Sequence, residues 1–176
     1  TKKDGIGRVR LQRPGSRNAL SAVMIDELAS VIGEVEADAD LRVVIIEGEG
    51  KSFCAGMDLK GVRDDPTAMG GMLEGLAEIS VRIRDLSVPT IARAHGAAIG
   101  GGCGLLAICD FAITHPEARI GYPEVDLGIC PAVVAPWLIQ RIGAGRARSL
   151  LLAGGTMNGE AALACGLVDE CVSLEM

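Results

Sequence analysis

The residues of this sequence that could support chemistry most directly are the glycines of a mid-chain stretch, 96–110, which reads GAAIGGGCGLLAICD. Glycine carries no Cβ atom, so the backbone N–H groups of such a stretch stay accessible to a ligand. The apolar residues that follow predict a buried helix that begins at the glycines. The first N–H groups of a helix lack internal acceptors and lie at its positive end. The stretch therefore predicts a place where a developing negative charge is stabilised.

The same glycines fit other patterns less completely. Gly102, Gly104 and Ala107 match the G-x-G-x-x-A dinucleotide fingerprint and follow a strand-like run, but they lie in mid-chain rather than in an opening βαβ unit. A Walker-type phosphate loop is excluded because no Gly-Lys-Ser/Thr follows. Close packing of a glycine turn against a neighbouring element remains a structural alternative.

The elements that would position these glycines begin with a strand, a helix and a second strand. Apolar and polar residues alternate over 6–11, which predicts a half-exposed strand, and apolar residues recur at helical spacing after Ser21, a good N-cap. Residues 42–47 form a short apolar run that is typical of a buried parallel strand. The loop 51–59 leaves the carboxyl end of that strand, where ligands gather in open α/β folds.

Strands and helices continue to alternate along the rest of the chain. A polar turn is expected over 61–67, and Asn158 is a good N-cap for the last helix. The predicted helices cover 69–86, 136–142, 146–153 and 159–165, and the predicted strands cover 88–92, 111–114, 119–121 and 167–172. This order predicts an α/β protein without an internal sequence repeat.

Composition excludes several classes of protein. The 176 residues, 49% of them hydrophobic and 23% charged, suit a single domain over 1–176. Aromatic residues make up 2% and the net charge is −6, so a surface for nucleic acid is not expected. No apolar run approaches the length that spans a membrane. This composition still allows a local basic pocket for an anionic ligand.

The cysteines and histidines suggest no metal site. The six cysteines contain no C-x-x-C pair and mostly occupy apolar runs, which is typical of reduced thiols and favours the cytoplasm. His95 and His115 are far apart in the chain and are expected to have structural or surface roles. The chain begins without a methionine and ends at Met176, which is consistent with a fragment of a longer protein.

Several motifs in series resemble those of the crotonase superfamily, the enoyl-CoA hydratases and isomerases. The segment 52–59 reads SFCAGMDL, 99–102 reads IGGG and leads to Cys109 and Asp110, and 121–129 reads GYPEVDLGI and is followed by Pro131. The segments 17–21 and 161–170 extend the resemblance over nearly the whole chain, in the family's order. The resemblance implies a spiral of repeated ββα units.

The resemblance also implies a reaction on an acyl-CoA thioester whose carbonyl oxygen is held by two backbone N–H groups. By motif position these donors are Met57 and Gly101, which agrees with the charge-stabilising role expected of the glycine stretch. Glu124 corresponds to the catalytic glutamate, and a carboxyl group among apolar neighbours has a pKa raised toward the range useful for proton transfer. Coenzyme A would be part of the substrate, so no separate cofactor is expected.

Other residues are assigned to binding or to structure. Ala19, Ala55 and Gly102 correspond to family segments that line the coenzyme A channel. Arg17 and Lys60 are candidates for contact with its phosphates. Asp58 is interpreted as an acceptor that holds its loop, and Tyr122 and Asp126 match no known family role.

One position departs from the pattern of the two-glutamate hydratases, which carry their other glutamate where this chain has Gly104. A single carboxylate suits isomerisation of the double bond, yet relatives that resemble this chain in the glycine motif and in the run from Pro131 to Pro136 are hydratases of branched glutaconyl-type CoA esters. We therefore expect an enoyl-CoA hydratase of fatty acid metabolism, with a single-glutamate isomerase as the first alternative. A non-catalytic acyl-CoA-binding protein is the second, and a nicotinamide oxidoreductase is a distant third.

Members of the family usually continue into helices that close the active site and join subunits as trimers or hexamers. The sequence ends before that region, so we expect a missing or truncated C-terminal helical region and a partly open acyl pocket. A homotrimer or hexamer is the expected assembly of the full-length protein.

Overall fold

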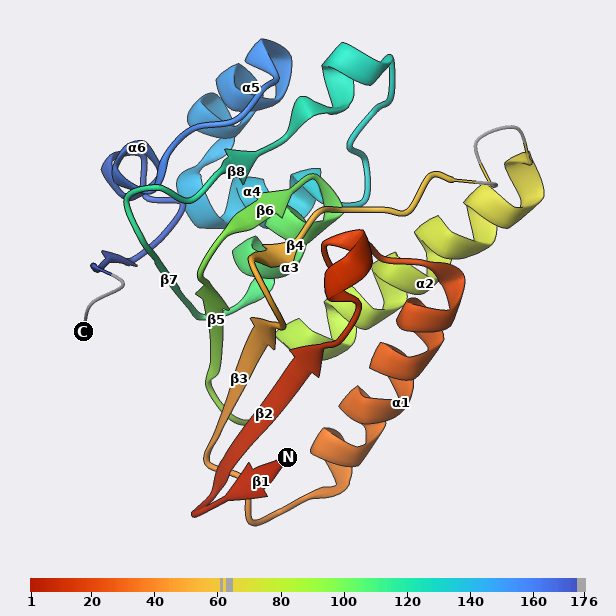
Figure 1. The fold of residues 1–176 in the computed structure, drawn as a ribbon, viewed down its shortest axis with the longest axis vertical. Helices are drawn as coiled ribbons and strands as arrows, with labels where there is room; N and C mark the ends of the chain where they lie inside the picture. Colours follow the sequence, from red (N-terminus) through yellow and green to blue (C-terminus); the bar gives the residue numbers. More distant parts are fainter. Residues whose placement is uncertain (61, 63–64, 174–176) are drawn as a thin grey trace.

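The computed structural model describes residues 1–60, 62 and 65–173, and its strands form two sheets (Figure 1). The larger sheet has the order β1-β2-β3-β5-β7-β9, and the smaller has the order β4-β6-β8. Only the β1–β2 pair is antiparallel among the described strands. The strands are β1 (Lys2–Lys3), β2 (Ile6–Leu11), β3 (Val43–Gly48), β4 (Ser52–Cys54), β5 (Thr90–Ala94), β6 (Ala97–Ile99), β7 (Phe111–Thr114), β8 (Ile120–Gly121) and β9 (Glu170–Cys171).

The chain winds as a spiral in which each turn gives one strand to each sheet. β3, β5 and β7 belong to the larger sheet, and each is followed by its partner in the smaller sheet, β4, β6 or β8, before a helix returns the chain. This confirms the α/β class and the spiral of ββα units. The helices are α1 (Ala22–Ala37), α2 (Pro66–Arg84), α3 (Gly101–Ile108), α4 (Ala135–Ile142), α5 (Ala144–Ala153) and α6 (Gly159–Ala164), with 3-10 turns η1 (Pro14–Ser16) and η2 (Pro123–Leu127).

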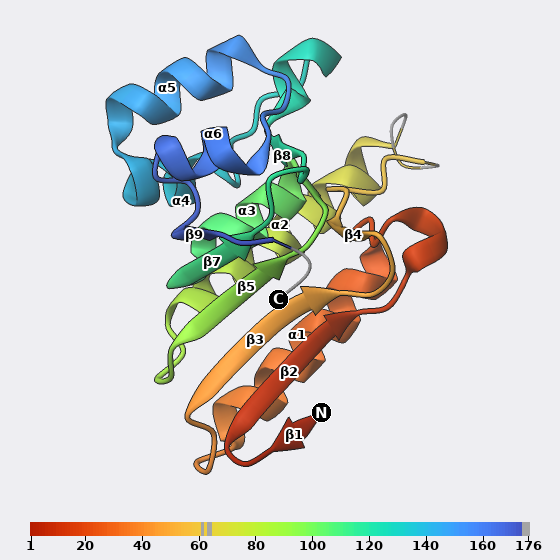
Figure 2. The same cartoon turned by 60° about the vertical axis from the view of Figure 1, so that its left-hand side comes forward.

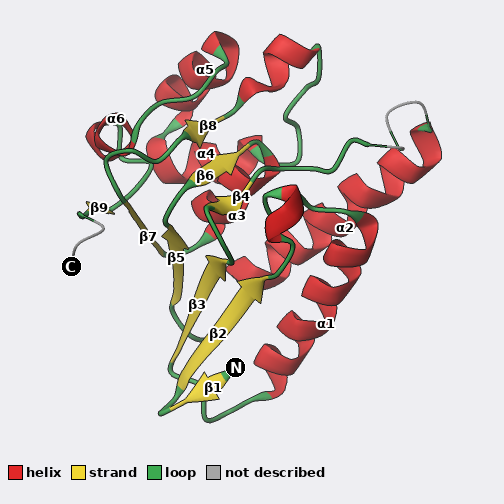
Figure 3. Cartoon of the chain, viewed as in Figure 1, coloured by secondary structure: helices red, strands yellow, loops and turns green. Residues whose placement is uncertain are grey.

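Helices α1 and α2 lie together on one face of the larger sheet (Figures 2 and 3). Along β2 the side chains alternate between exposed and buried, as predicted for 6–11. On the opposite face of the sheet Glu47 pairs with Arg8, Arg10 and Arg93 of the neighbouring strands. Burial opposes ionisation of Glu47, but the hydrogen bond from Arg10 and the nearby guanidinium charges lower the pKa of its carboxyl group.

Helix starts follow the predicted caps closely. Ser21 Oγ accepts from Met24 N, and Asn158 Oδ1 accepts from Ala161 N, as the sequence indicated. The cap of α2 is Asp65, which accepts from two backbone N–H groups. In the predicted turn over 61–67, residues 61, 63 and 64 lie outside the described residues, and the helix begins at Pro66 rather than Met69.

The short strands were predicted less well. The loop expected over 51–59 contains β4, because Ser52 and Cys54 pair with β6 far along the chain. The strand expected over 88–92 begins at Thr90 and extends to Ala94, since its register is set by β3 and β7. The strand expected over 167–172 pairs with β7 only through Glu170 and Cys171.

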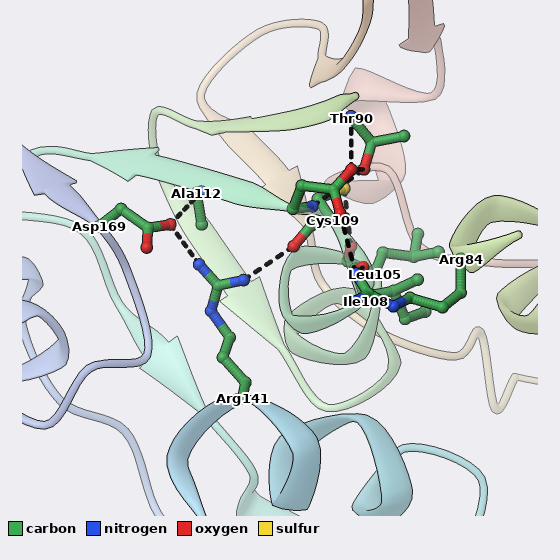
Figure 4. Close-up of polar contacts among 9 residues, drawn as sticks. Arg84, Thr90, Leu105, Ile108, Cys109, Ala112, Arg141 and Asp169 are labelled. Carbon is green, nitrogen blue, oxygen red and sulfur yellow. Dashed lines mark hydrogen bonds and ion pairs between the residues drawn. The ribbon is translucent and has the colours of Figure 1, made fainter. Parts of the chain in front are cut away.

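Helix α3 lies at the centre of the molecule, and all eight of its residues are buried. Its C-terminal end is held by Arg141 of α4 (Figure 4). Arg141 Nη1 donates to Cys109 O at 2.8 Å, and Nε donates to Leu167 O at 2.7 Å. Nη2 pairs with Asp169, whose carboxylate also accepts from Ala112 N. One nearly buried guanidinium therefore joins α4 to the end of α3 and to β7.

None of the helices in the described part of the chain has the length and apolar character to cross a bilayer.

We predict that Arg141→Ala lowers the free energy of unfolding by about 3 kcal/mol, because it leaves buried carbonyl groups without a donor and Asp169 without its partner. Arg84 pairs with Asp110 at the same end of α3 but is about half exposed, so Arg84→Ala is the matched control and should cost less than about 1 kcal/mol. Denaturant unfolding measures both. Equal losses in the two variants would contradict this account of Arg141.

Candidate active site

The smaller sheet brings the three candidate catalytic residues to one edge. Its strands β4, β6 and β8 are parallel, so their carboxyl ends lie at the same edge of the sheet. Met57 follows β4, Gly101 follows β6, and Glu124 follows β8. All three line one apolar pocket. The structure thus brings together the residues that the motifs singled out separately.

The wall of this pocket comes from four parts of the chain. Apart from Glu124, no charged side chain occurs among the described residues that line it. The lining residues are Ala55, Gly56, Met57 and Leu59; Leu73 and Leu76 of α2; Ile99, Gly100 and Gly101; and Pro123, Glu124, Leu127, Ile129, Cys130, Pro131, Ala132, Val133 and Val134. The pocket therefore offers an apolar environment around a single carboxyl group.

The N–H of Met57 is directed by a short parallel pairing with Leu20. Leu20 N donates to Gly56 O at 2.8 Å, and Asp58 N donates to Leu20 O at 2.8 Å. The peptide unit between Gly56 and Met57 is planar and trans, so the Met57 N–H points opposite to Gly56 O and away from Leu20. It has no acceptor among the residues that the structure describes.

Gly101 supplies the second free N–H as the first residue of α3. The preceding Gly100 has φ +54°, a left-handed conformation that favours glycine and lets the chain turn from β6 into the helix. A Cβ atom on Gly56 would lie 3.5 Å from Gly101 N, so the Met57 segment runs directly against the start of α3. Gly101 N also lacks an acceptor within the described part of the chain. Two unpaired N–H groups therefore border the same pocket.

Glu124 lies beside these donors. A Cβ atom on Gly100 would lie 2.7 Å from Glu124 Oε1, so the carboxyl group sits directly over the residue before Gly101. Its Oε2 is buried and has no hydrogen-bond partner among the described residues. Burial raises the pKa of the Glu124 carboxyl group, and its own backbone N–H opposes that shift only in part. The group is suited to accept and return a proton.

Gly104 packs against Val134, which lies just before α4 and on the pocket wall. A Cβ atom on Gly104 would lie 3.0 Å from Val134 Cβ and still closer to Val134 Cγ1. Both residues are buried. The place where the two-glutamate hydratases carry a carboxylate is therefore filled here by an aliphatic side chain, a contact that the sequence motifs did not indicate.

The residues assigned to coenzyme A divide into two groups. Ala19 and Ala55 line a second pocket beside the first, together with Arg17 and Lys60. Gly102 lines neither pocket: a Cβ atom there would lie 2.8 Å from Cys54 Cβ, so its role in the structure is close packing of α3 against β4. The packing explanation for the glycine stretch thus holds for Gly102, as it does for Gly96 and Gly104.

The remaining sequence candidates have structural contacts. Asp58 accepts from Arg13 Nη2 at 3.1 Å, which confirms its role as a loop-holding acceptor. Tyr122 is fully buried outside the pocket lining, and Asp126 accepts from Gly155 N at 3.2 Å. His115 Nε2 lies 2.9 Å from His95 O, which is a structural contact.

All six cysteines are free. Within the described part of the chain, no cluster of three or more His, Cys, Asp or Glu side chains is arranged to hold a metal ion.

A spiral of ββα units with a small parallel sheet that ends at two free amides and a buried carboxyl group defines the crotonase architecture. A family model described as enoyl-CoA hydratase/isomerase matches residues 1–176, and the chain belongs to that family. Membership removes the dinucleotide-binding interpretation of Gly102, Gly104 and Ala107, because the helix that they form belongs to a different fold.

Curated relatives and solved structures agree with this assignment. The chain is 36% identical over 174 residues to the short-chain-enoyl-CoA hydratase of Clostridium acetobutylicum, a match that covers 97% of this chain and 67% of that relative. It is 37% identical over 177 residues to a probable mitochondrial enoyl-CoA hydratase of Dictyostelium discoideum, covering 99% of this chain and 63% of the relative. The chain spans about two thirds of the length of the curated relatives that it matches.

Among solved structures, Pseudomonas aeruginosa AtuE superposes with a TM-score of 0.93 at 36% identity, over 98% of this chain and 69% of that one. An enoyl-CoA hydratase from Bacillus anthracis superposes with a TM-score of 0.94 at 31% identity, over 99% and 69% of the two chains.

We predict that Glu124→Gln makes the folded protein more stable at neutral pH. The folded-state pKa of Glu124 is raised, so the stability associated with its neutral form is present below the unfolded-state pKa and is lost as pH rises through the folded-state value. The midpoint of thermal unfolding of the variant should therefore rise relative to that of the natural protein as pH increases above about 4, the ordinary range of a glutamate pKa. If the difference between the two unfolding midpoints does not change with pH, the pKa of the Glu124 carboxyl group is not raised in the folded protein.

We predict that Gly104→Ala lowers the free energy of unfolding by about 1–3 kcal/mol, because the added methyl group overpacks the contact with Val134. In the double variant Gly104→Ala, Val134→Ala the new methyl group occupies space that the smaller residue leaves free. The losses in unfolding free energy of the two single variants should therefore sum to more than the loss in the double variant. Denaturant unfolding of all four proteins measures this double-mutant cycle. Additive losses would argue against the contact.

Proposed function

We propose that this protein hydrates the double bond of an enoyl-CoA thioester in the pocket at the start of α3. The observation that carries the proposal is the position of the Glu124 carboxyl group beside two backbone N–H groups without protein acceptors. Free amides beside a buried carboxyl group are what a reaction through an enolate requires, because charge forms on the carbonyl oxygen while a proton moves on the adjacent carbon.

In the proposed reaction the thioester oxygen accepts hydrogen bonds from Met57 N–H and Gly101 N–H. Water adds its oxygen to the β-carbon, and Glu124 takes the proton that the water releases. Electrons of the double bond move to the thioester oxygen, where the two N–H groups stabilise the enolate. Glu124 then returns its proton to the α-carbon, which restores the carbonyl group and leaves the carboxylate unchanged overall.

The second pocket suits the coenzyme A portion of such a substrate. Ala19 and Ala55 form part of its wall, and Arg17 and Lys60 bring two positive charges near phosphate groups that would lie there. Coenzyme A enters as part of the substrate, so the proposal needs no resident cofactor. The homotrimer or hexamer and the cytoplasmic location remain predictions.

The residues that line the first pocket indicate whether the acyl group carries a charge. A branched glutaconyl-type ester carries a second carboxylate, which needs a positive or hydrogen-bonding partner when it is removed from water. No Lys, Arg or His occurs among the described residues that line this pocket. We therefore propose an uncharged acyl chain rather than the carboxylated esters expected from the resemblance.

A single-carboxylate isomerase remains the second candidate, and the contact between Gly104 and Val134 favours it. That contact leaves no space for a second carboxylate at position 104, and one base is sufficient to move a proton between two carbons. In this alternative the same N–H groups stabilise the same enolate, but no water is added.

Hydration and isomerisation can be distinguished by the mass of the product. The protein is incubated with straight-chain and carboxylated enoyl-CoA esters in water enriched in heavy oxygen, and the products are analysed by mass spectrometry. We expect the label in the product of an uncharged ester and a loss of turnover on the order of a thousandfold in Glu124→Gln. Movement of the double bond without label would establish the isomerase. Unchanged turnover in Glu124→Gln would contradict both catalytic candidates.

A further inference from the structure

We propose that Arg13 is a positioning residue for the reaction, because it fixes the direction of the Met57 N–H from outside the pocket. The inference rests on the proposed function, in which this N–H is one of two donors to the thioester oxygen. Arg13 does not line the pocket itself. Its effect on catalysis would be transmitted through the backbone of the two segments that it joins.

The direction of the Met57 N–H depends on a short pairing between the segments 17–20 and 55–58. Three backbone hydrogen bonds join the two segments: Ala55 N to Arg17 O, Leu20 N to Gly56 O and Asp58 N to Leu20 O. The Leu20–Met57 pair is an isolated bridge rather than part of a continuous ladder. Gly56 has φ +87°, a conformation that glycine adopts with little cost. A short pairing next to such a glycine needs support from elsewhere to remain in one orientation.

Arg13 provides that support across the pairing. Its Nη1 donates to Ala19 O at 2.6 Å, and its Nη2 donates to Asp58 Oδ2 at 3.1 Å. Ala19 precedes Leu20 on one segment, and Asp58 follows Met57 on the other. The guanidinium group thus connects the two segments on either side of the Leu20–Met57 bridge, and its planar geometry fixes their separation.

The segment that carries Ala19 is itself fixed to the small sheet. Asn18 is fully buried with φ +55°, and its Nδ2 donates to Glu49 O at 2.9 Å and to Ser52 O at 2.8 Å. Its Oδ1 accepts from Arg13 N at 2.9 Å. Asn18 therefore holds one segment against β4, and Arg13 holds the loop after β4 against that segment.

This arrangement matters for catalysis because hydrogen-bond donors are effective only when they already point to the place where charge develops. Removal of one donor of this kind typically slows a reaction by about a hundredfold to a thousandfold. Loss of Arg13 leaves the Met57 N–H in place but releases its orientation, so a smaller effect is expected. The side chain of Arg13 is about one third exposed, which makes its substitution compatible with folding.

The test uses Arg13→Ala and Arg13→Lys, with Arg82→Ala as the matched control. Arg82 likewise pairs with a carboxylate, that of Glu36, to which it donates two hydrogen bonds, but it lies on α2 away from the pocket lining. We expect Arg13→Ala to lower kcat on the order of tenfold with little change in KM, and Arg13→Lys to recover part of that loss. Arg82→Ala should leave both constants unchanged.

A second readout does not depend on turnover. A saturated acyl-CoA labelled at the thioester carbonyl is bound to each protein, and the carbonyl stretching frequency is measured by infrared difference spectroscopy. Hydrogen bonds from both N–H groups should lower this frequency in the natural protein, and Arg13→Ala should return it part of the way toward its value in water. Circular dichroism and thermal unfolding confirm that each variant is folded.

The outcomes separate the two proposals. A lowered frequency that persists unchanged in Arg13→Ala overturns the role of Arg13 and leaves the proposed function intact. No lowering in the natural protein overturns both, because the two N–H groups then do not hold the carbonyl oxygen. A loss of kcat in Arg13→Ala that Arg82→Ala reproduces would also overturn the positioning role.

Discussion

The parallel pairing of three very short strands is the constraint on which the candidate site depends. Because β4, β6 and β8 run in the same direction, the residues that follow them emerge at one edge, with the residue after β6 in the middle. Each strand has no more than three residues, so the pairing itself contributes little stability. The larger sheet and the helices around it must hold these strands in register, and the spiral does so by making each of them the continuation of a strand in the larger sheet.

Helix α3 connects this edge to the rest of the core. Its first turn presents unpaired N–H groups and the positive end of the helix dipole to the pocket. At its other end Arg141 and Arg84 place positive charge near the last carbonyl groups, as the dipole favours. The glycines in the first turn allow β4 to pack directly against the helix, so the helix axis and the position of Met57 are fixed by the same contact. The electrostatic and steric requirements of the site are met by one element.

Local sequence signals predicted the longer elements well. The apolar alternation located β2, the caps at Ser21 and Asn158 located two helix starts, and the glycine stretch indicated a helix start that could stabilise charge. These signals involve only a few neighbouring residues, so they can be recognised in a single sequence. The motifs then placed Met57, Gly101 and Glu124 in one family pattern, and the structure shows that they share a pocket.

The contacts that were not predicted join residues that are far apart in the chain. β4 exists because of its partner β6, Arg13 reaches Asp58 across 45 positions, and Val134 meets Gly104 from a loop before α4. Neither hydrophobic periodicity nor a helix-capping residue predicts such long-range pairings. For Gly102 the motif predicts a place near coenzyme A, which stays a prediction, while the long-range contact with Cys54 gives a separate reason for a glycine there.

The contact between Gly104 and Val134 also bears on how this site could change over evolutionary time. A carboxylate could not be introduced at position 104 while a branched side chain occupies the adjacent volume. A lineage would first have to acquire a smaller residue at position 134, at the cost of a cavity, before a glutamate could follow. The contact with Val134 therefore favours one order of substitutions, in which the change at position 134 comes first.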